Sequence, residues 1–229
     1  MKERPILFSA PMVRAILNGS KTQTRRVLKP QPPGEADSMF ICHHPDPRPH
    51  FYAFDGTALM DFAVPCPYGK PGDQLWVRET WRKGFYPDTS DRSWRGGSTE
   101  TYLYRADEGS EIFKRGWKPS IHMPREASRI QLEITNIRIE RLQDISAEDC
   151  KAEGILPNWC GDLAGFDGDE HGWLPFELRP GEENIPGVDI YEQLTPQRAY
   201  QVLWESINGP GSWDANPWVW VVEFRRIKP

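Results

Sequence analysis

The clearest constraint on this chain is the alternation of apolar and polar residues over positions 129–142. Apolar residues occupy every second position from Ile130 to Ile134, which is the period of a strand with one face on a core. The apolar positions then change phase and resume at Ile137, which predicts a bulge or turn near residues 135–136. We therefore expect a long strand with an irregularity in its middle.

Other elements are expected where similar signals recur. Strands are predicted where apolar and polar residues alternate or β-branched residues cluster, at residues 22–28, 74–81, 100–106 and 216–227. Helices are predicted where a proline or a capping residue precedes an apolar segment and a glycine follows it, at residues 11–18, 146–153 and 196–208. Strands that bracket short helices indicate a mixed α+β domain whose sheet can curl into a small barrel.

Three long segments rich in glycine, proline and charged residues separate these elements, at 30–67, 82–128 and 155–194. They are longer than ordinary connections in a compact domain and carry little periodicity. The chain has 229 residues, which suits one large domain or two small ones. We expect one domain, 1–229, that carries three insertions.

Charge and hydropathy restrict the partners of this chain. Lys and Arg number 28 against 33 Asp and Glu, for a net charge of -5, which argues against a broad footprint on duplex nucleic acid but allows a local basic pocket. No apolar run approaches the roughly 20 residues that span a bilayer, and the N-terminal residues lack the apolar stretch of a signal peptide. A cytoplasmic protein without a membrane partner is expected.

Cysteine and histidine usage does not point to a metal or a disulfide framework. The cysteines form no CxxC pair, so reduced thiols are expected. One group of residues includes metal-ligand types, but its spacing matches no common zinc pattern: Cys42, His43, His44, His50 and Cys66.

The segment "GSKTQTRR", residues 19–26, follows the first predicted helix and gathers Lys21, Thr24 and two arginines. Burial or a cationic neighbour lowers the pKa of a lysine and can leave a neutral amine. A neutral amine beside a hydroxyl is the activation pattern of Ser/Lys hydrolases. On a regular strand these two side chains point to opposite faces, so they can meet only if the chain turns. An exposed basic turn before a strand is the alternative interpretation.

This segment resembles the G-x-K-x-x-[ET]-x-R signature of ASCH domains, with Gly19, Lys21, Thr24 and Arg26 at the four fixed places. The threonine form is similar to small bacterial N4-acetylcytidine amidohydrolases, whose proposed catalytic set is a Lys, a Thr three residues later and a distant Glu near the end of a helix. The segment "LQDISAEDCKAEG" resembles the one that carries this Glu and puts Glu153 at its place.

The resemblance covers about half of the chain and implies a PUA-like (ASCH) small β-barrel with flanking helices. It also includes the turn "PGDQLWV", with Gly72 and Asp73 before a strand. The three insertions depart from the small enzymes and are similar to longer ASCH proteins, so the choice of substrate stays open.

The resemblance implies a hydrolase that removes acyl groups from N4-acylated cytosine or cytidine without a metal or another cofactor. Lys21 would be the general base, Thr24 the nucleophile, and Glu153 would orient Lys21 or the hydrolytic water. Arg26 would bind a carbonyl or stabilise the developing oxyanion. The implied partner is a small nucleoside or nucleobase.

Two residues of the predicted strand 74–81 are further candidates for substrate binding. Glu79 would lie on the apolar side of that strand, where a carboxylate most often forms a structural ion pair but can also be a rival catalytic acid. Trp76 can stack on a base or belong to the core. The alternating Trp218 and Trp220 of the last strand favour a core role over base stacking, and Asp149 favours helix capping.

Two other functions remain compatible with these residues. One is a non-catalytic module that binds RNA or a modified nucleotide, because PUA-like barrels often bind RNA. The other is a ribonuclease of the ASCH superfamily, with Lys21 and Glu153 in phosphate chemistry. Thr24 distinguishes the hydrolase from a binding module, since acyl transfer needs an alcohol at this place and a binding module does not.

Overall fold

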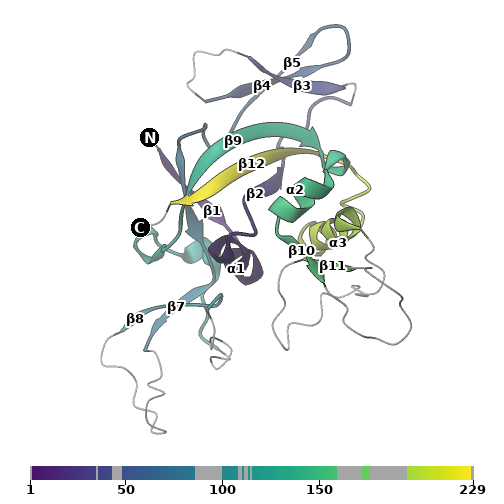
Figure 1. Cartoon of the computed structure of the whole chain (residues 1–229). Coiled ribbons are helices and arrows are strands. Elements are labelled where there is room, and N and C mark those ends of the chain that lie inside the picture. The colour runs from purple at the N-terminus through teal and green to yellow at the C-terminus, as the bar shows by residue number, and fades with distance from the viewer. Residues whose placement is uncertain are drawn as a thin grey trace, which may run out of the picture.

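A curved five-stranded sheet in the order β1-β6-β9-β12-β2 organises the chain (Figure 1). The computed structural model describes residues 2–34, 36–42, 48–85, 100–107, 110, 113, 115–158, 172–175 and 195–227. β1 and β6 are parallel, and the other neighbours are antiparallel. The strands are β1 (Glu3–Leu7), β2 (Gln23–Val27), β6 (Gln74–Arg78), β9 (Gln131–Arg141) and β12 (Trp218–Ile227).

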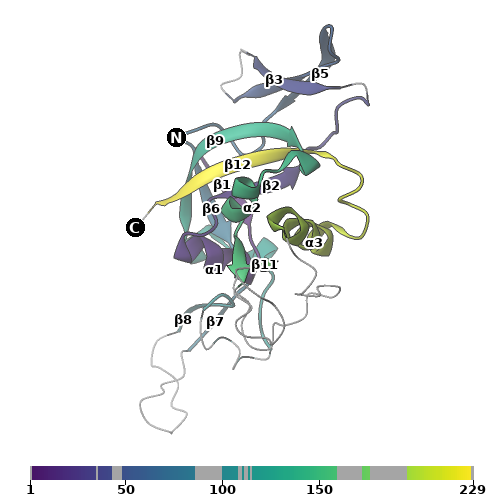
Figure 2. The same ribbon diagram turned by 45° about the vertical axis from the view of Figure 1, so that its right-hand side comes forward.

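The long strands β9 and β12 form an arch together in both views (Figures 1 and 2). Their register shifts between Glu223 and Phe224, which pair with Asn136 and Ile134, so Thr135 is an extra residue in β9. An extra residue of this kind bends a strand and increases its twist. The irregularity predicted from the change of phase is therefore confirmed.

The sheet is curved but open. Among the described residues no backbone pairing joins the edge strands β1 and β2, although Arg26 of β2 donates a hydrogen bond to the carbonyl oxygen of Leu7 in β1 at 2.6 Å. The mixed α+β class is confirmed, whereas backbone hydrogen bonds do not close the expected barrel. A side chain bridges the two edges instead.

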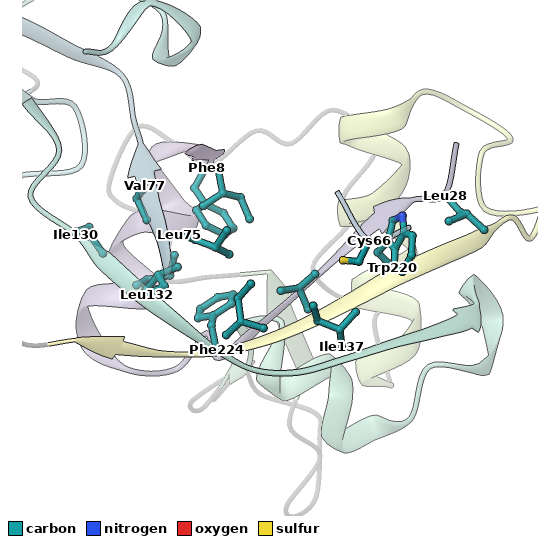
Figure 3. Packing of buried hydrophobic residues seen from close by; sticks show 14 of the residues in the cluster. Phe8, Leu28, Cys66, Leu75, Val77, Ile130, Leu132, Ile137, Trp220 and Phe224 are labelled. Atoms are coloured by element: carbon teal, nitrogen blue, oxygen red, sulfur yellow. The ribbon is translucent and has the colours of Figure 1, made fainter. Parts of the chain in front are cut away.

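Both faces of the sheet are covered by apolar residues, which explains the composition of β12. Trp220 and Phe224 lie in one core cluster with Leu132 and Ile137 (Figure 3). Val219 and Val221 point the other way, into a second cluster with α3. The core interpretation of the alternating tryptophans is therefore confirmed.

Three α-helices occupy the predicted places. α1 (Ala10–Asn18) ends at Gly19, whose φ of 86° is left-handed. α2 (Ala147–Ala152) begins after Ser146, whose hydroxyl accepts a hydrogen bond from the backbone N–H of Asp149 at 3.0 Å. α3 (Pro196–Asn208) begins after Thr195, which caps it in the same way. Short 3-10 helices are present at Ser120–His122, Arg125–Ala127 and Leu142–Asp144.

The first insertion forms strands although its sequence carries little periodicity. It contains β3 (Ser38–Cys42), β4 (His50–Phe54) and β5 (Leu59–Pro65), which form a separate three-stranded sheet. Phe51 packs edge-on against Trp220, with ring centroids 5.2 Å apart. This insertion therefore contributes to the main core, a long-range contact that local periodicity does not reveal.

The predicted strand 74–81 is interrupted at residues 79–80. β6 ends at Arg78, and β7 (Trp81–Gly84) leaves the main sheet to pair with β8 (Thr101–Tyr104), which lies in the predicted segment 100–106. Figures 1 and 2 show this hairpin at the end of the molecule opposite β3–β5. In the third insertion β10 (Ile155–Asn158) pairs with β11 (Gly172–Pro175), and residues 159–171 and 176–194 lie outside the described residues.

None of the helices in the described ranges combines the length and the apolar character needed to cross a membrane.

Replacing Trp220 with Ala should lower the free energy of unfolding by about 3–5 kcal/mol, because it leaves a cavity between the main sheet and β4. Urea unfolding followed by fluorescence or circular dichroism measures the change. The control is Ile121→Ala, since Ile121 is exposed and should change the value by less than about 0.5 kcal/mol. Equal effects of the two substitutions would contradict this account of the core.

Candidate active site

The connection between α1 and β2 contains the "GSKTQTRR" segment, and backbone hydrogen bonds fix its position. The backbone N–H of Lys21 donates to the carbonyl oxygen of Ala15 at 2.9 Å, and that of Thr22 donates to the carbonyl oxygen of Ala152 at 2.8 Å. Lys21 also forms an isolated antiparallel bridge with Glu153. The segment is thus attached to the end of α1 on one side and to the end of α2 on the other.

Lys21 and Glu153 are in direct contact although 132 residues separate them. The amine Nζ lies 2.6 Å from Oε2 of Glu153 and 2.9 Å from its backbone oxygen. The two residues are only 2 % and 3 % exposed, and the ring of Phe8 faces the amine at 6.0 Å. The structure therefore brings two of the three predicted catalytic residues together in a place without solvent.

The pKa of Lys21 is lowered from its ordinary value, chiefly because burial disfavours the charged ammonium. Glu153 acts in the opposite direction, and the charges of Arg25 and Arg26 add to the lowering. A neutral amine has two N–H donors and one lone pair. The two oxygens of Glu153 can accept both N–H groups, which leaves the lone pair able to take a proton.

Arg25 connects this pair to a larger network of ionic contacts. Its guanidinium lies 3.4 Å from Oε1 of Glu153, 2.8 Å from Asp149 and 3.0 Å from Glu140. Arg138 also contacts Asp149, at 2.9 Å. Burial acts to raise the pKa of Asp149, but the two arginines outweigh it and the pKa is lowered. Asp149 therefore binds arginine and is more than the helix-capping residue that the sequence suggested.

The sequence reasoning did not find this network. It treated Arg25 as a cationic neighbour of Lys21, because the partners of Arg25 come from β9 and α2, more than 100 positions away. The network requires β9 and β2 to be the two neighbours of β12, which is a property of the sheet order. No local pattern carries that information.

A cavity of about 340 Å³ lies beside the buried pair. Thr24, Arg26 and Glu153 line it on one side, and α3 lines it on the other. Thr24 is 2 % exposed, so its hydroxyl is sheltered. The cavity is of the size that binds small molecules.

Thr24 and Lys21 are not hydrogen bonded to each other within the described residues. Within the described residues the hydrogen bonds of the amine go to Glu153, and Lys21 does not line the cavity. Glu153 is the common element, because it contacts the amine and also lines the cavity with Thr24. The predicted set is therefore assembled around Glu153.

Arg26 lies at the cavity wall, as a residue for substrate binding should. It is half-buried, its guanidinium carbon lies 5.4 Å from the centre of the Phe8 ring, and one amino group donates to the carbonyl oxygen of Leu7. Its Nε is buried without a hydrogen-bond partner in the described part of the chain. Part of its hydrogen-bonding capacity is thus unused by the protein.

Tyr200 of α3 is a site residue that the sequence reasoning missed. It lines the cavity and is 3 % exposed. Burial, and then the nearby charge of Glu153, raise the pKa of its hydroxyl well above the ordinary value. It is one of the buried residues of α3, and nothing local in the sequence links it to Glu153.

Glu79 and Trp76 do not line the cavity. Both oxygens of Glu79 accept hydrogen bonds from Arg129, at 2.9 and 3.0 Å, and burial raises its pKa although Arg129 opposes this. Trp76 lies against the guanidinium groups of Arg78 and Arg125, at 5.0 and 5.8 Å. The structural ion pair expected for Glu79 is present, and a role for either residue in this cavity is not supported.

The cysteines and the metal-ligand types give no additional site. Cys66 and Cys150 are free and buried, and no group of three or more His, Cys, Asp or Glu residues that could hold a metal lies in the described ranges. His43, His44, Cys160 and the side chain of Cys42 lie outside the described residues.

No family model, no curated protein and no solved structure matches the chain. The interpretation of the site therefore rests on its own geometry.

The lowered pKa of Lys21 makes stability depend on pH. Between that lowered value and the ordinary 10.5, the unfolded chain binds the Lys21 proton and the folded chain does not. The contribution of Lys21 to the free energy of unfolding should therefore rise with pH in this window, by up to about 1.4 kcal/mol per pH unit.

Urea unfolding of the wild-type protein and of Lys21→Met from pH 6 to 10 measures this contribution as the difference between the two curves. Other groups, such as Tyr200, titrate in both proteins and cancel in the difference. A difference that stays constant or falls with pH would show that Lys21 remains charged in the folded protein.

Proposed function

We propose that this protein is an amidohydrolase that removes acyl groups from the N4 position of cytosine nucleosides, with Thr24 as nucleophile, Lys21 as general base and Glu153 as positioning residue. The observation that carries the proposal is the buried contact of Lys21 with Glu153 at 2.6 Å, beside a cavity that Glu153 and Thr24 both line. Among the described residues the Thr24 side chain makes no hydrogen bond, so its hydroxyl is available to a ligand in the cavity.

In the proposed reaction the Thr24 oxygen attacks the acyl carbonyl carbon while its proton moves to the neutral amine of Lys21. The tetrahedral intermediate then collapses, the bond from carbon to N4 breaks, and the Lys21 ammonium returns the proton to the leaving N4 amine. A water molecule next attacks the resulting ester, with Lys21 again as the base. The products are the free carboxylic acid and the cytosine nucleoside.

The amine must reach Thr24 for the first proton transfer. In the structure the amine is buried and held by Glu153, so it has to leave one of these contacts to reach Thr24. The long lysine side chain has the rotatable bonds that such a movement needs, and the backbone bridge to Glu153 keeps Lys21 near the cavity. Arg25 contacts Glu153 as well, so this carboxylate keeps a cationic partner when Lys21 is neutral. Arg26 at the same wall is suited to bind a polar group of the substrate.

The family-level part of the proposal is a long ASCH domain with a PUA-like fold and a cytoplasmic location. Three features of the structure are compatible with it. The sheet is curved, a helix directly precedes the signature, and the signature leads into the edge strand β2.

Binding of RNA or a modified nucleotide without catalysis is the second candidate. It is favoured by one observation: Lys21 and Glu153 satisfy each other's hydrogen bonds, and none joins Lys21 to Thr24 within the described ranges. In this alternative the ion pair is purely structural.

Replacing Thr24 with Val should abolish turnover of N4-acetylcytidine, with a loss of at least about 1,000-fold, because the nucleophile is removed while shape is kept. Chromatographic detection of cytidine measures it. The matched control is Thr22→Val, two positions earlier, where the side chain is exposed; it should keep turnover within about twofold. Full turnover in Thr24→Val would exclude Thr24 as the nucleophile. RNA binding that persists in both variants without any hydrolysis would favour the binding module.

The rate should rise with pH as Lys21 loses its proton, with a midpoint below the ordinary lysine pKa of 10.5. Measurement of kcat/KM for N4-acetylcytidine from pH 5 to 10 tests this. Lys21→Arg keeps a long cationic side chain that does not deprotonate, so this variant should be inactive at every pH. An active Lys21→Arg enzyme would rule out general base catalysis by this residue.

A further inference from the structure

The lining of the cavity that Thr24 and Glu153 share combines two chemically different groups of side chains. The residues from α3 are largely apolar and aromatic, with Leu203, Trp204 and Ile207. The residues from β2 and the segment after it include two cations, Arg26 and Lys29. A ligand that fills the cavity should therefore have one flat or apolar part and one anionic part.

The two cations have no carboxylate partner among the described residues, since none lies within salt-bridge distance of Arg26 or Lys29. Lys29 is exposed at the cavity, and Arg26 uses a single amino group on the carbonyl oxygen of Leu7 and leaves its Nε unpartnered. Their charges are thus available to a ligand.

The neighbouring arginine shows the contrast. Arg25 also contributes to the cavity lining, but it contacts three carboxylates and its charge is consumed by the ionic network. A chain with 33 acidic against 28 basic residues has acidic side chains to place opposite Arg26 and Lys29. Two cations that line one cavity without a carboxylate partner in the described ranges are therefore best explained by an anionic ligand.

We infer that the substrate is a cytidine nucleotide, whose terminal phosphate binds Lys29 and Arg26 while its base lies against the wall formed by α3. This inference rests on the proposed function, because it takes an N4-acylated cytosine as the reacting end. It adds that the enzyme prefers a 5′-phosphorylated compound to the free nucleoside.

The spacing along the chain fits such a ligand. Lys29 lies five residues after Thr24, so their Cα atoms are at most about 17 Å apart, and the flexible lysine side chain can reach back toward the cavity. In a cytidine nucleotide the N4 atom and the 5′-phosphate lie at opposite ends of the molecule. An acyl group on N4 can then meet Thr24 while the phosphate meets the cations.

A mononucleotide fits these observations better than RNA does. The cavity of about 340 Å³ is near the lower end of small-molecule sites, and the chain has a net charge of -5. A polynucleotide needs a track of cations along its backbone, whereas the lining of this cavity supplies two cations without a carboxylate partner in the described ranges, Arg26 and Lys29.

Binding of cytidine 5′-monophosphate and of cytidine, measured by isothermal titration calorimetry, tests the inference without requiring turnover. The nucleotide should bind at least about tenfold more tightly at low salt, since charge-assisted hydrogen bonds to a phosphate are strong, and the difference should shrink as salt rises. Lys29→Glu should remove the difference. Lys70→Glu, at an exposed lysine that does not line the cavity, is the matched control and should keep it.

Equal affinity of the two compounds, or a difference that survives in Lys29→Glu, would overturn the inference even if N4-acetylcytidine is hydrolysed. Tighter binding of the nucleotide together with no hydrolysis of acylated nucleosides or nucleotides would support the phosphate site and overturn the proposed function. In a competition measurement, a short cytidine-containing RNA that binds more tightly than cytidine 5′-monophosphate would overturn the inference, because RNA would then be the preferred ligand.

Discussion

The contact between Lys21 and Glu153 is the constraint on which the rest of the site depends. It joins the turn after α1 to the end of α2, through side chains and through a backbone bridge, in a place from which solvent is excluded. Removing one member of such a buried pair is costly, because the other is left without its partner. The pair therefore fixes the turn after α1 and the end of α2 relative to each other.

The electrostatics of this region divide into a satisfied part and an unsatisfied part. Arg25 and Arg138 are surrounded by carboxylates of β9, α2 and β12, and they hold α2 against the sheet. Arg26 and Lys29, a few residues further along the same segment, have no carboxylate partner in the described ranges and line the cavity. Basic residues that are close in the sequence thus have different electrostatic surroundings, although Arg25 also lines the cavity.

Part of this arrangement could be predicted from the sequence alone because the signals are local. The end of α1 at Gly19 depends on a left-handed backbone conformation. The start of α2 after Ser146 depends on a hydroxyl that accepts a hydrogen bond from the backbone N–H three residues later. Short segments encode both features. The phase change within β9 reports its extra residue directly. The signature residues Lys21, Thr24 and Glu153 were identified from a resemblance, and the structure brings Lys21 into contact with Glu153 and places Thr24 with Glu153 at one cavity.

The rest was decided by tertiary structure. Whether the sheet closes into a barrel depends on the edges β1 and β2, where a side chain of Arg26 connects the strands and backbone pairing does not. Sheet order and the packing of helices on each face decide three further features. Arg25 contacts carboxylates, Tyr200 lies near Glu153, and Glu79 lies away from the cavity. Local periodicity reports which side of an element is buried, and it cannot report what that side meets, because the partner lies 50 to more than 100 positions away in the chain.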